Sequence, residues 1–127
     1  MYQDLAVFQY AGAMAAHAGK RQAVVAANIA HADTPGYQAK VLDDFRSHVS
    51  TDQGLALSAT RPAHFNAADG FMAAKPVISA GEPALNGNTV SLEDELLRAV
   101  DVSREHNRAL TIYRHALTVL NAAIGRR

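Results

Sequence analysis

The sequence predicts a mainly α fold in which two long terminal helices pair as an antiparallel coiled coil and are joined by an irregular middle segment. The first observation is an apolar pattern near both ends of the chain, repeating at alternating steps of three and four residues. The second is that all four prolines and five of the eight glycines lie between residues 31 and 90. We therefore interpret residues 1–127 as a single domain with helices at about 3–30 and 91–124.

The composition limits the class of protein. Hydrophobic residues make up 49% of the 127 residues, but many are alanine and only 6% are aromatic, so we expect a thin, long core. Twelve basic residues balance twelve acidic ones, which gives no support to a nucleic-acid partner. The absence of cysteine excludes disulfides and thiolate metal sites, and no apolar run reaches the roughly 18 residues of a membrane span.

The first helix, at about 3–30, carries a heptad-like seam with small residues in its middle. Gly12 and Gly19 each cost about 1 kcal/mol in a helix interior, so we expect a helix that is weak alone and is ordered by neighbours. Residues 6–19 are apolar enough for a signal peptide, but the uncharged start and the continuation into Lys20-Arg21 favour a mature helix. The seam comprises Leu5, Phe8, Gly12, Ala15, Gly19, Gln22, Ala26 and Ile29.

The first helix is expected to stop in the run NIAHADTPGY at residues 28–37. Thr34 precedes Pro35, whose ring disfavours the α conformation at the residue before it. Pro35 and Gly36 suit the two corners of a type II turn, which needs a positive φ at Gly36, and Tyr37 then follows as an amphipathic anchor. Two short polar side chains flank this stop and can hydrogen-bond freed backbone groups: Asn28 and Asp33.

The middle segment, at about 31–90, has no helical spacing. Its short apolar pieces at 55–57 and 71–78 are compatible with strands or with turns of helix. Asn86-Gly87-Asn88 is a turn signal with a residue suited to positive φ at its centre. A loose segment of this length is either an irregular subdomain or a region that orders on assembly.

The second helix has the strongest periodic signal in the chain. Ser91 can cap it, with Asp94 three residues on in a capping-box arrangement, and Asp94 to Arg98 is a favourable i,i+4 pair. Gly125 is expected to end the helix, which would then be roughly 50 Å long. Its seam comprises Leu92, Leu96, Ala99, Ser103, His106, Leu110, Tyr113, Leu117, Leu120 and Ile124.

The sequence offers no credible catalytic constellation. The six histidines are scattered and lack the helical spacing and nearby carboxylate of a zinc site. No nucleophile elbow or phosphate-binding loop is present. We expect no enzyme activity, cofactor, metal or small-molecule substrate, and we interpret His106 as a packed or hydrogen-bonded position that fixes helix register.

The junction motif resembles the N-terminal signature of bacterial flagellar rod and hook proteins, in the form N-I-A-N-A-D-T-P-G-Y typical of the proximal rod protein family (rod protein B). Arg21-Gln22, Tyr37–Lys40, Ala59–Phe65 and Pro83–Val90 also resemble that family. His31 departs from the motif, where the family usually has asparagine. The matching residues are Asn28, Ile29, Asp33, Thr34, Pro35, Gly36 and Tyr37.

The resemblance implies a structural subunit of the flagellar basal-body rod that links the membrane ring to the rest of the rod. Its terminal helices would pair and then stack on neighbouring subunits in a tube, and its expected partners are copies of itself, other rod proteins, the rod-to-ring adaptor and the membrane-ring protein. It also implies export through the flagellar type III apparatus into the periplasm without a cleaved signal. The residues expected to form the assembly seam are Leu5, Phe8, Ile29, Leu92, Leu96, Leu110, Tyr113, Leu117, Leu120 and Ile124.

Two other functions are compatible with the residues alone. A cytosolic helical adaptor that dimerises through its C-terminal heptads is the main alternative. A small hydrolase is supported only by scattered polar residues.

Overall fold

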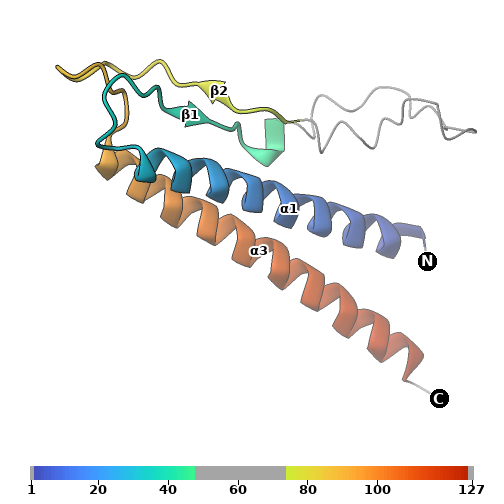
Figure 1. The fold of residues 1–127 in the computed structure, drawn as a ribbon. Helices are drawn as coiled ribbons and strands as arrows, with labels where there is room; N and C mark the ends of the chain where they lie inside the picture. Colours follow the sequence, from blue (N-terminus) through green and yellow to red (C-terminus); the bar gives the residue numbers. More distant parts are fainter. Residues whose placement is uncertain (1, 48–73, 126–127) are drawn as a thin grey trace, which may run out of the picture.

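The computed structural model describes residues 2–47 and 74–125, with the side chains of the first helix described from residue 7 onward. Along the chain follow α1 (Tyr2–Ala30), β1 (Lys40–Val41), β2 (Val77–Ile78) and α3 (Leu92–Ile124). The two helices lie side by side and run in opposite directions, and they diverge toward the end that holds both termini (Figure 1). We call the other end, where α1 stops and α3 begins, the pole.

Local chemistry explains the bounds of α3. The Ser91 hydroxyl accepts a hydrogen bond from the Asp94 backbone N–H at 3.4 Å, which confirms the predicted cap, and Gly125 ends the helix. One detail of the prediction is wrong, because Arg98 pairs with Glu95 at 2.6 Å and not with Asp94. Glu95, three residues before Arg98, lies on the buried side of the helix within reach of the Arg98 guanidinium group.

Small side chains make the contact between α1 and α3. The buried residues are Ala11, Ala18 and Val25 on α1, and Val102 and Ala109 on α3. Small residues let the helix axes approach closely, so the contact uses little apolar area per residue. Toward the free ends, one aromatic pair extends the contact: the rings of Phe8 and Tyr113 meet edge to face, 5.2 Å apart.

In the middle of the helices both predicted seams are displaced by about one residue from this contact, whereas Phe8 and Tyr113, one member of each seam, do meet. The side chains expected in the middle of the seams are exposed, and the buried positions directly precede most of them. The leucine-rich pattern of α3 follows its outward apolar stripe, whereas alanines decide which face meets α1. The misassigned positions are Gly12, Gly19, Gln22, Ala26, Ser103 and His106.

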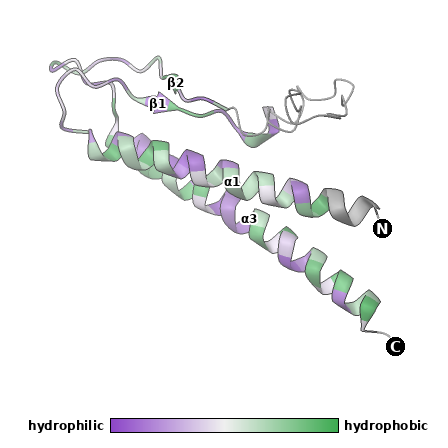
Figure 2. Cartoon of the chain, turned by 45° about the vertical axis from the view of Figure 1, so that its right-hand side comes forward, coloured by the Kyte–Doolittle hydropathy of each residue, from purple (hydrophilic) through white to green (hydrophobic). Residues whose placement is uncertain are grey.

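Large apolar side chains of α3 are therefore left at the surface. Figure 2 shows apolar residues continuing along α3 to its free end. Ile124 is 68% exposed and Leu110 is half-buried. The other exposed members of the predicted seam are Leu92, Leu96, Tyr113, Leu117 and Leu120.

An arm of extended chain covers the side of α1 opposite α3 (Figure 1). Within it, β1 pairs antiparallel with β2, with Lys40 opposite Ile78. This ladder settles the ambiguity over the end of the 71–78 piece in favour of a strand, while residues 55–57 and 71–73 lie outside the described residues. His17, which had no expected role, is a buried residue here, with its ring 5.6 Å from that of Phe45.

Arg21 of α1 forms ion pairs both with α3 and with the segment after β1. The Arg21 Nη1 atom lies 2.6 Å from Glu105 Oε2 on α3 and 3.0 Å from Asp44 Oδ1 after β1. The side chain of Arg21 is only 14% exposed, so solvent screens its pair with Glu105 less than a surface pair. This contact fixes how far α1 and α3 can slide along each other.

Candidate assembly site

The turn after α1 has the geometry that the sequence predicts. The Tyr37 backbone N–H donates to the Thr34 carbonyl at 3.3 Å, and Gly36 has a φ of +71°. With Pro35 and Gly36 at its two corners, this is a type II turn. The φ of Gly36 is one that other residues rarely adopt, so the turn depends on this glycine.

A second glycine turn lies against the first. Gly87 has a φ of +76°, confirming the predicted turn, and its backbone N–H donates to the Ala84 carbonyl at 2.8 Å. A Cβ atom on Gly87 would lie 3.5 Å from the Gly36 Cα atom. The Gly36 N–H also donates to the Asn86 carbonyl at 3.0 Å, so the two turns are joined directly.

Asn88 connects the second turn to the end of α1. Its side chain is buried, and the Nδ2 atom lies 3.0, 2.7 and 3.0 Å from the carbonyl oxygens of His31, Ala32 and Thr34. Its Oδ1 atom accepts from the Val90 N–H at 2.8 Å. Asn88 therefore joins three carbonyls of the turn that follows α1, from a position more than fifty residues away, although two of them, those of His31 and Thr34, also accept a backbone N–H.

Asn28 holds the returning chain against α1 from the other side. It is buried, and its carboxamide forms two hydrogen bonds with the Lys40 backbone, donating to the carbonyl at 2.7 Å and accepting from the N–H at 3.0 Å. The Tyr37 hydroxyl also lies 3.5 Å from Asn28 Oδ1. Asn28 thus bonds the backbone of β1 and not the groups expected at the helix stop, and the Asp33 side chain is exposed.

His31 fits the site despite its departure from the family motif. Its ring stacks on the Tyr37 ring with centroids 4.5 Å apart, and its Nδ1 atom lies 3.2 Å from the Thr34 hydroxyl. Among the described residues, positive φ occurs only at glycines, so the imidazole imposes no left-handed backbone here. We call residues 28–40 and 84–91 together the clasp.

The sequence identified most of the clasp but missed what Asn88 does. Asn88 was seen only as part of a turn, because nothing local indicates that its side chain would reach His31, Ala32 and Thr34.

A shallow groove of about 420 Å³ runs between the outward faces of α1 and α3. Five predicted seam residues line it, so this part of both seams borders an opening between the helices. Leu5 lies in the first turn of α1, where only the backbone is described. The lining residues are Ala18, Gly19, Gln22, Ala23, Ala26, Val102, Ser103 and His106.

Residues 2–47 and 74–125 contain no group of three or more histidine, aspartate or glutamate side chains placed to hold a metal. No helix in these ranges has both the length and the hydropathy needed to cross a membrane.

Comparison with known proteins identifies the family. Residues 11–38 match the family model described as "Flagella basal body rod protein". The flagellar basal body rod protein FlgB of Salmonella typhimurium is 35% identical over 103 residues, covering 73% of this chain and 74% of that protein. The chain belongs to the FlgB family of flagellar rod proteins. Two further relatives support this assignment. FlgB of Escherichia coli is 34% identical, covering 72% of this chain and 73% of that protein. FlgB of Agrobacterium fabrum is 29% identical, covering 83% of this chain and 82% of that protein.

Membership of the FlgB family decides between the functions left open by the residues. The FlgB family consists of structural proteins and not of enzymes, which excludes the hypothesis that the chain is a small hydrolase. It assigns the chain to the rod of the flagellar basal body and to motility, in association with other rod and basal-body components. This assignment favours the rod subunit over the cytosolic adaptor. The clasp includes the second part of the stretch that the family model matches.

Proposed function

We propose that this chain is a single-domain subunit of the proximal rod that self-assembles through its terminal helices and links the membrane ring to the rest of the rod. The observation that carries the proposal is the apolar stripe of α3, which α1 leaves in water. Its large members include Leu117, Leu120 and Ile124, which are 37%, 36% and 68% exposed.

The driving force for assembly lies in these side chains. Each aliphatic side chain contributes roughly 1.5–3 kcal/mol when it passes from full exposure to full burial, so several partly exposed ones together favour association. The groove between the helices is lined at Gly19, Ala23 and Ala26 by small residues, which can receive the larger side chains of a neighbouring helix. In the assembled rod, α1 and α3 act as an antiparallel coiled coil that packs laterally on its neighbours.

The partners follow from the same role. They are other copies of the chain, other rod proteins, the rod-to-ring adaptor and the membrane-ring protein, with the type III export apparatus as the route into the periplasm. No cleaved signal is required, because residues 6–19 belong to α1 and continue it without a break. The names of the FlgB relatives, which concern the basal body rod, support this role.

The test places a charge on the stripe. We expect Leu117→Asp to stop rod growth and abolish motility, because a carboxylate would be desolvated at an apolar contact, while the chain is still made and delivered to the export apparatus. The matched control is Thr111→Asp, which puts the same charge on an exposed position of α3 away from the groove. Normal rods and swimming in the Leu117→Asp strain would refute assembly through this stripe.

A further inference from the structure

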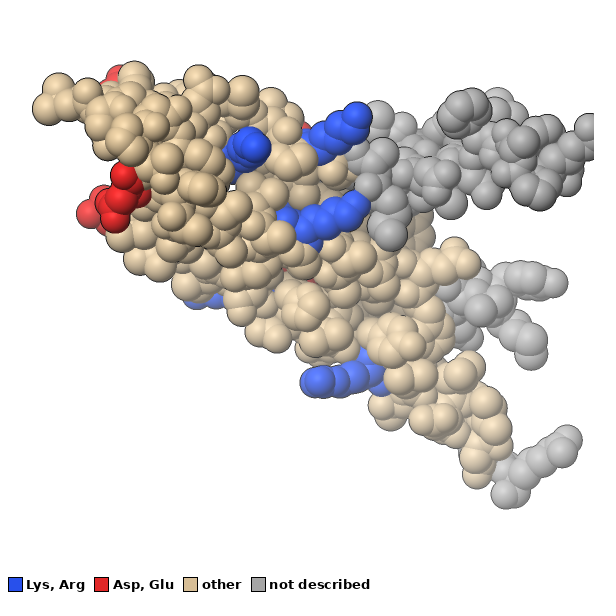
Figure 3. Space-filling model, in the orientation of Figure 1, with Lys and Arg blue, Asp and Glu red and all other residues tan. Residues whose placement is uncertain are grey.

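Charge is distributed unevenly along the molecule. The described residues at the pole, 31–37 and 81–96, contain five acidic residues and no lysine or arginine. The second half of α3, residues 106–125, contains Arg108 and Arg114 and no acidic residue. Figure 3 shows acidic atoms gathered at the pole, and only basic ones on the visible face toward the free end of α3. The acids at the pole are Asp33, Glu82, Glu93, Asp94 and Glu95.

A polar hollow opens at this acidic end. It has a volume of about 430 Å³ and lies between the 79–91 segment and the first turns of α3. Glu82, Asp94 and Glu95 line it, together with Arg98, which already donates to Glu95 Oε1 at 2.6 Å. The Glu95 side chain is 2% exposed, and within the described residues its Oε2 atom has no hydrogen-bond partner. The hollow therefore has unused capacity for a cationic group.

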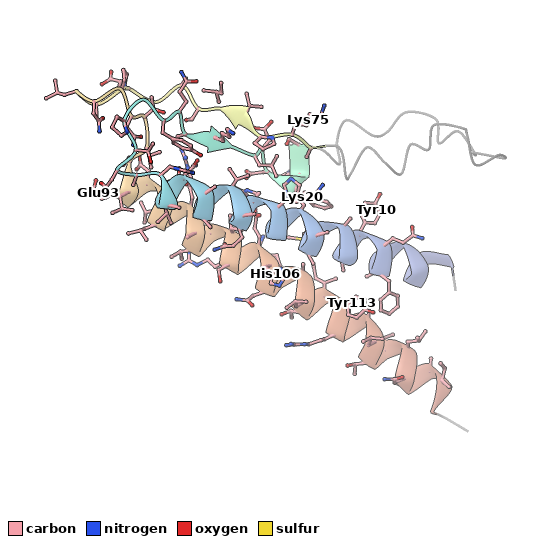
Figure 4. The ribbon with its side chains drawn as sticks, in the orientation of Figure 1. Tyr10, Lys20, Lys75, Glu93, His106 and Tyr113 are labelled. Carbon is pink, nitrogen blue, oxygen red and sulfur yellow. The ribbon has the colours of Figure 1, made fainter. Side chains whose placement is uncertain are left out.

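Helix chemistry explains only part of the acidic cluster. Acidic residues in the first turn of α3 favour the positive end of the helix dipole, which accounts for Glu93, Asp94 and Glu95. Asp33 and Glu82 lie outside the helix, so the dipole does not account for them. Glu93 is labelled at the pole in Figure 4, beside the start of α3.

The opposite charges cannot meet within one molecule. Glu93 and Arg114 lie on the same straight helix, about 30 Å apart at 1.5 Å per residue. At that separation, salt at 0.1 M, with a screening length of about 10 Å, removes most of their attraction. Apolar residues accompany both ends, with Leu85 and Leu92 exposed near the pole and Leu120 and Ile124 near the free end. The two ends are complementary only between molecules.

We propose that the acidic pole of one molecule binds the basic second half of α3 of a second copy, in a head-to-tail contact. Arg108 and Arg114 of the second copy lie against the carboxylates of Glu82, Glu93 and Asp94, and one of them enters the hollow. This contact rests on the proposed self-assembly and adds an axial direction to the lateral packing of the stripe. Because the two surfaces differ, the contact repeats along a line instead of closing a dimer.

Charge exchange tests this contact in purified full-length chains. The pole variant is Glu82→Lys with Glu93→Lys, and the helix variant is Arg108→Glu with Arg114→Glu. Alone, each variant sets like charges against each other, so sedimentation velocity should show self-association weakened by about tenfold or more. An equimolar mixture should associate like the unmodified chain, because each variant then meets an opposite charge on the other. Equal weakness of the mixture would overturn the proposal.

Controls separate the charge effect from misfolding and from the stripe. Asp43→Lys with Asp101→Lys makes the same change in net charge at exposed positions away from the pole and should leave association unchanged. Circular dichroism reports whether each variant is folded, and a chain carrying all four pole and helix substitutions should self-associate again. If Leu117→Asp abolishes association while the charge variants do not alter it, the head-to-tail contact is wrong and the proposed function stands. If the unmodified chain does not associate at any salt concentration, the proposed self-assembly itself fails.

Discussion

At the pole, buried asparagine side chains hydrogen-bond the backbone of neighbouring turns, whereas along the free half of α3 the chain leaves large apolar side chains in water. The clasp buries the carboxamides of Asn28 and Asn88 and joins two glycine turns that lie against each other. Toward its free end α3 diverges from α1 (Figure 1), and Leu117, Leu120 and Ile124 are exposed there. Contacts within the chain therefore determine the structure of the pole. The free end of α3 instead presents apolar side chains that are suited to contacts with other molecules.

The largest expected effect comes from removing the amide that holds the clasp. We expect Asn88→Leu to lower the free energy of unfolding by about 3 kcal/mol, since it removes the hydrogen bonds of a buried carboxamide to the His31, Ala32 and Thr34 carbonyls and to the Val90 N–H. Urea unfolding followed by circular dichroism measures this change. Asn121→Leu, at an exposed position of α3, is the control and should shift the free energy by less than about 0.5 kcal/mol. Equal effects of the two substitutions would contradict the role of Asn88.

Overpacking the helix contact should have the next largest effect. Ala109 is fully buried against α1, so Ala109→Leu forces the helices apart and should lower the free energy of unfolding by about 1–3 kcal/mol. His106→Leu, on the same helix but exposed, should be nearly neutral, and thermal melting compares the pair. If Ala109→Leu is tolerated and His106→Leu is not, the helices meet on the predicted seam after all.

Two glycines should respond with opposite signs. Gly36→Ala places a Cβ atom at a positive φ and should lower the free energy of unfolding by about 1–2 kcal/mol. Gly12→Ala, at a helical position with no atom within 4 Å of the new Cβ, should raise it by up to about 1 kcal/mol. Chemical denaturation of both variants checks the signs, and a stabilising Gly36→Ala would show that the turn does not need a glycine.

The smallest effect is expected on the stripe. Ile124→Ala should change the free energy of unfolding of the dilute chain by less than about 0.5 kcal/mol, because the Ile124 side chain is 68% exposed and contributes little to the intrachain core. The same substitution should weaken self-association, which sedimentation at rising concentration measures. Strong destabilisation of the dilute chain would mean that this half of α3 is packed within the molecule.

The sequence was most informative where structure depends on neighbouring residues. The cap at Ser91 and the turns at Gly36 and Gly87 depend on the φ preferences and side chains of a few consecutive residues, and all three are found in the structure. The contact between Arg21 and Glu105 joins residues 84 positions apart, and no local pattern indicates it.

The displacement of the predicted seams has a different physical cause. Hydrophobic periodicity assigns most weight to leucine and isoleucine, and in this chain those residues belong to the outward stripe. The intrachain contact is made by alanines such as Ala18 and Ala109, whose small size allows close approach but gives a weak hydrophobic signal. A periodic pattern of large apolar residues therefore indicates a helix interface, but it does not indicate whether the partner helix belongs to the same chain.

The reach of Asn88 also affects when the protein can fold. The carbonyls of His31, Ala32 and Thr34, just after α1, bind Asn88 only after the intervening residues have been synthesised and the two segments have met. Contacts of such sequence separation form slowly, because chain entropy is lost before they contribute any stability. A nascent chain that has reached only α1 and the first turn lacks the clasp and, with Gly12 and Gly19 in its helix, is poorly helical. Completion of the fold is thus delayed until the start of α3 has emerged.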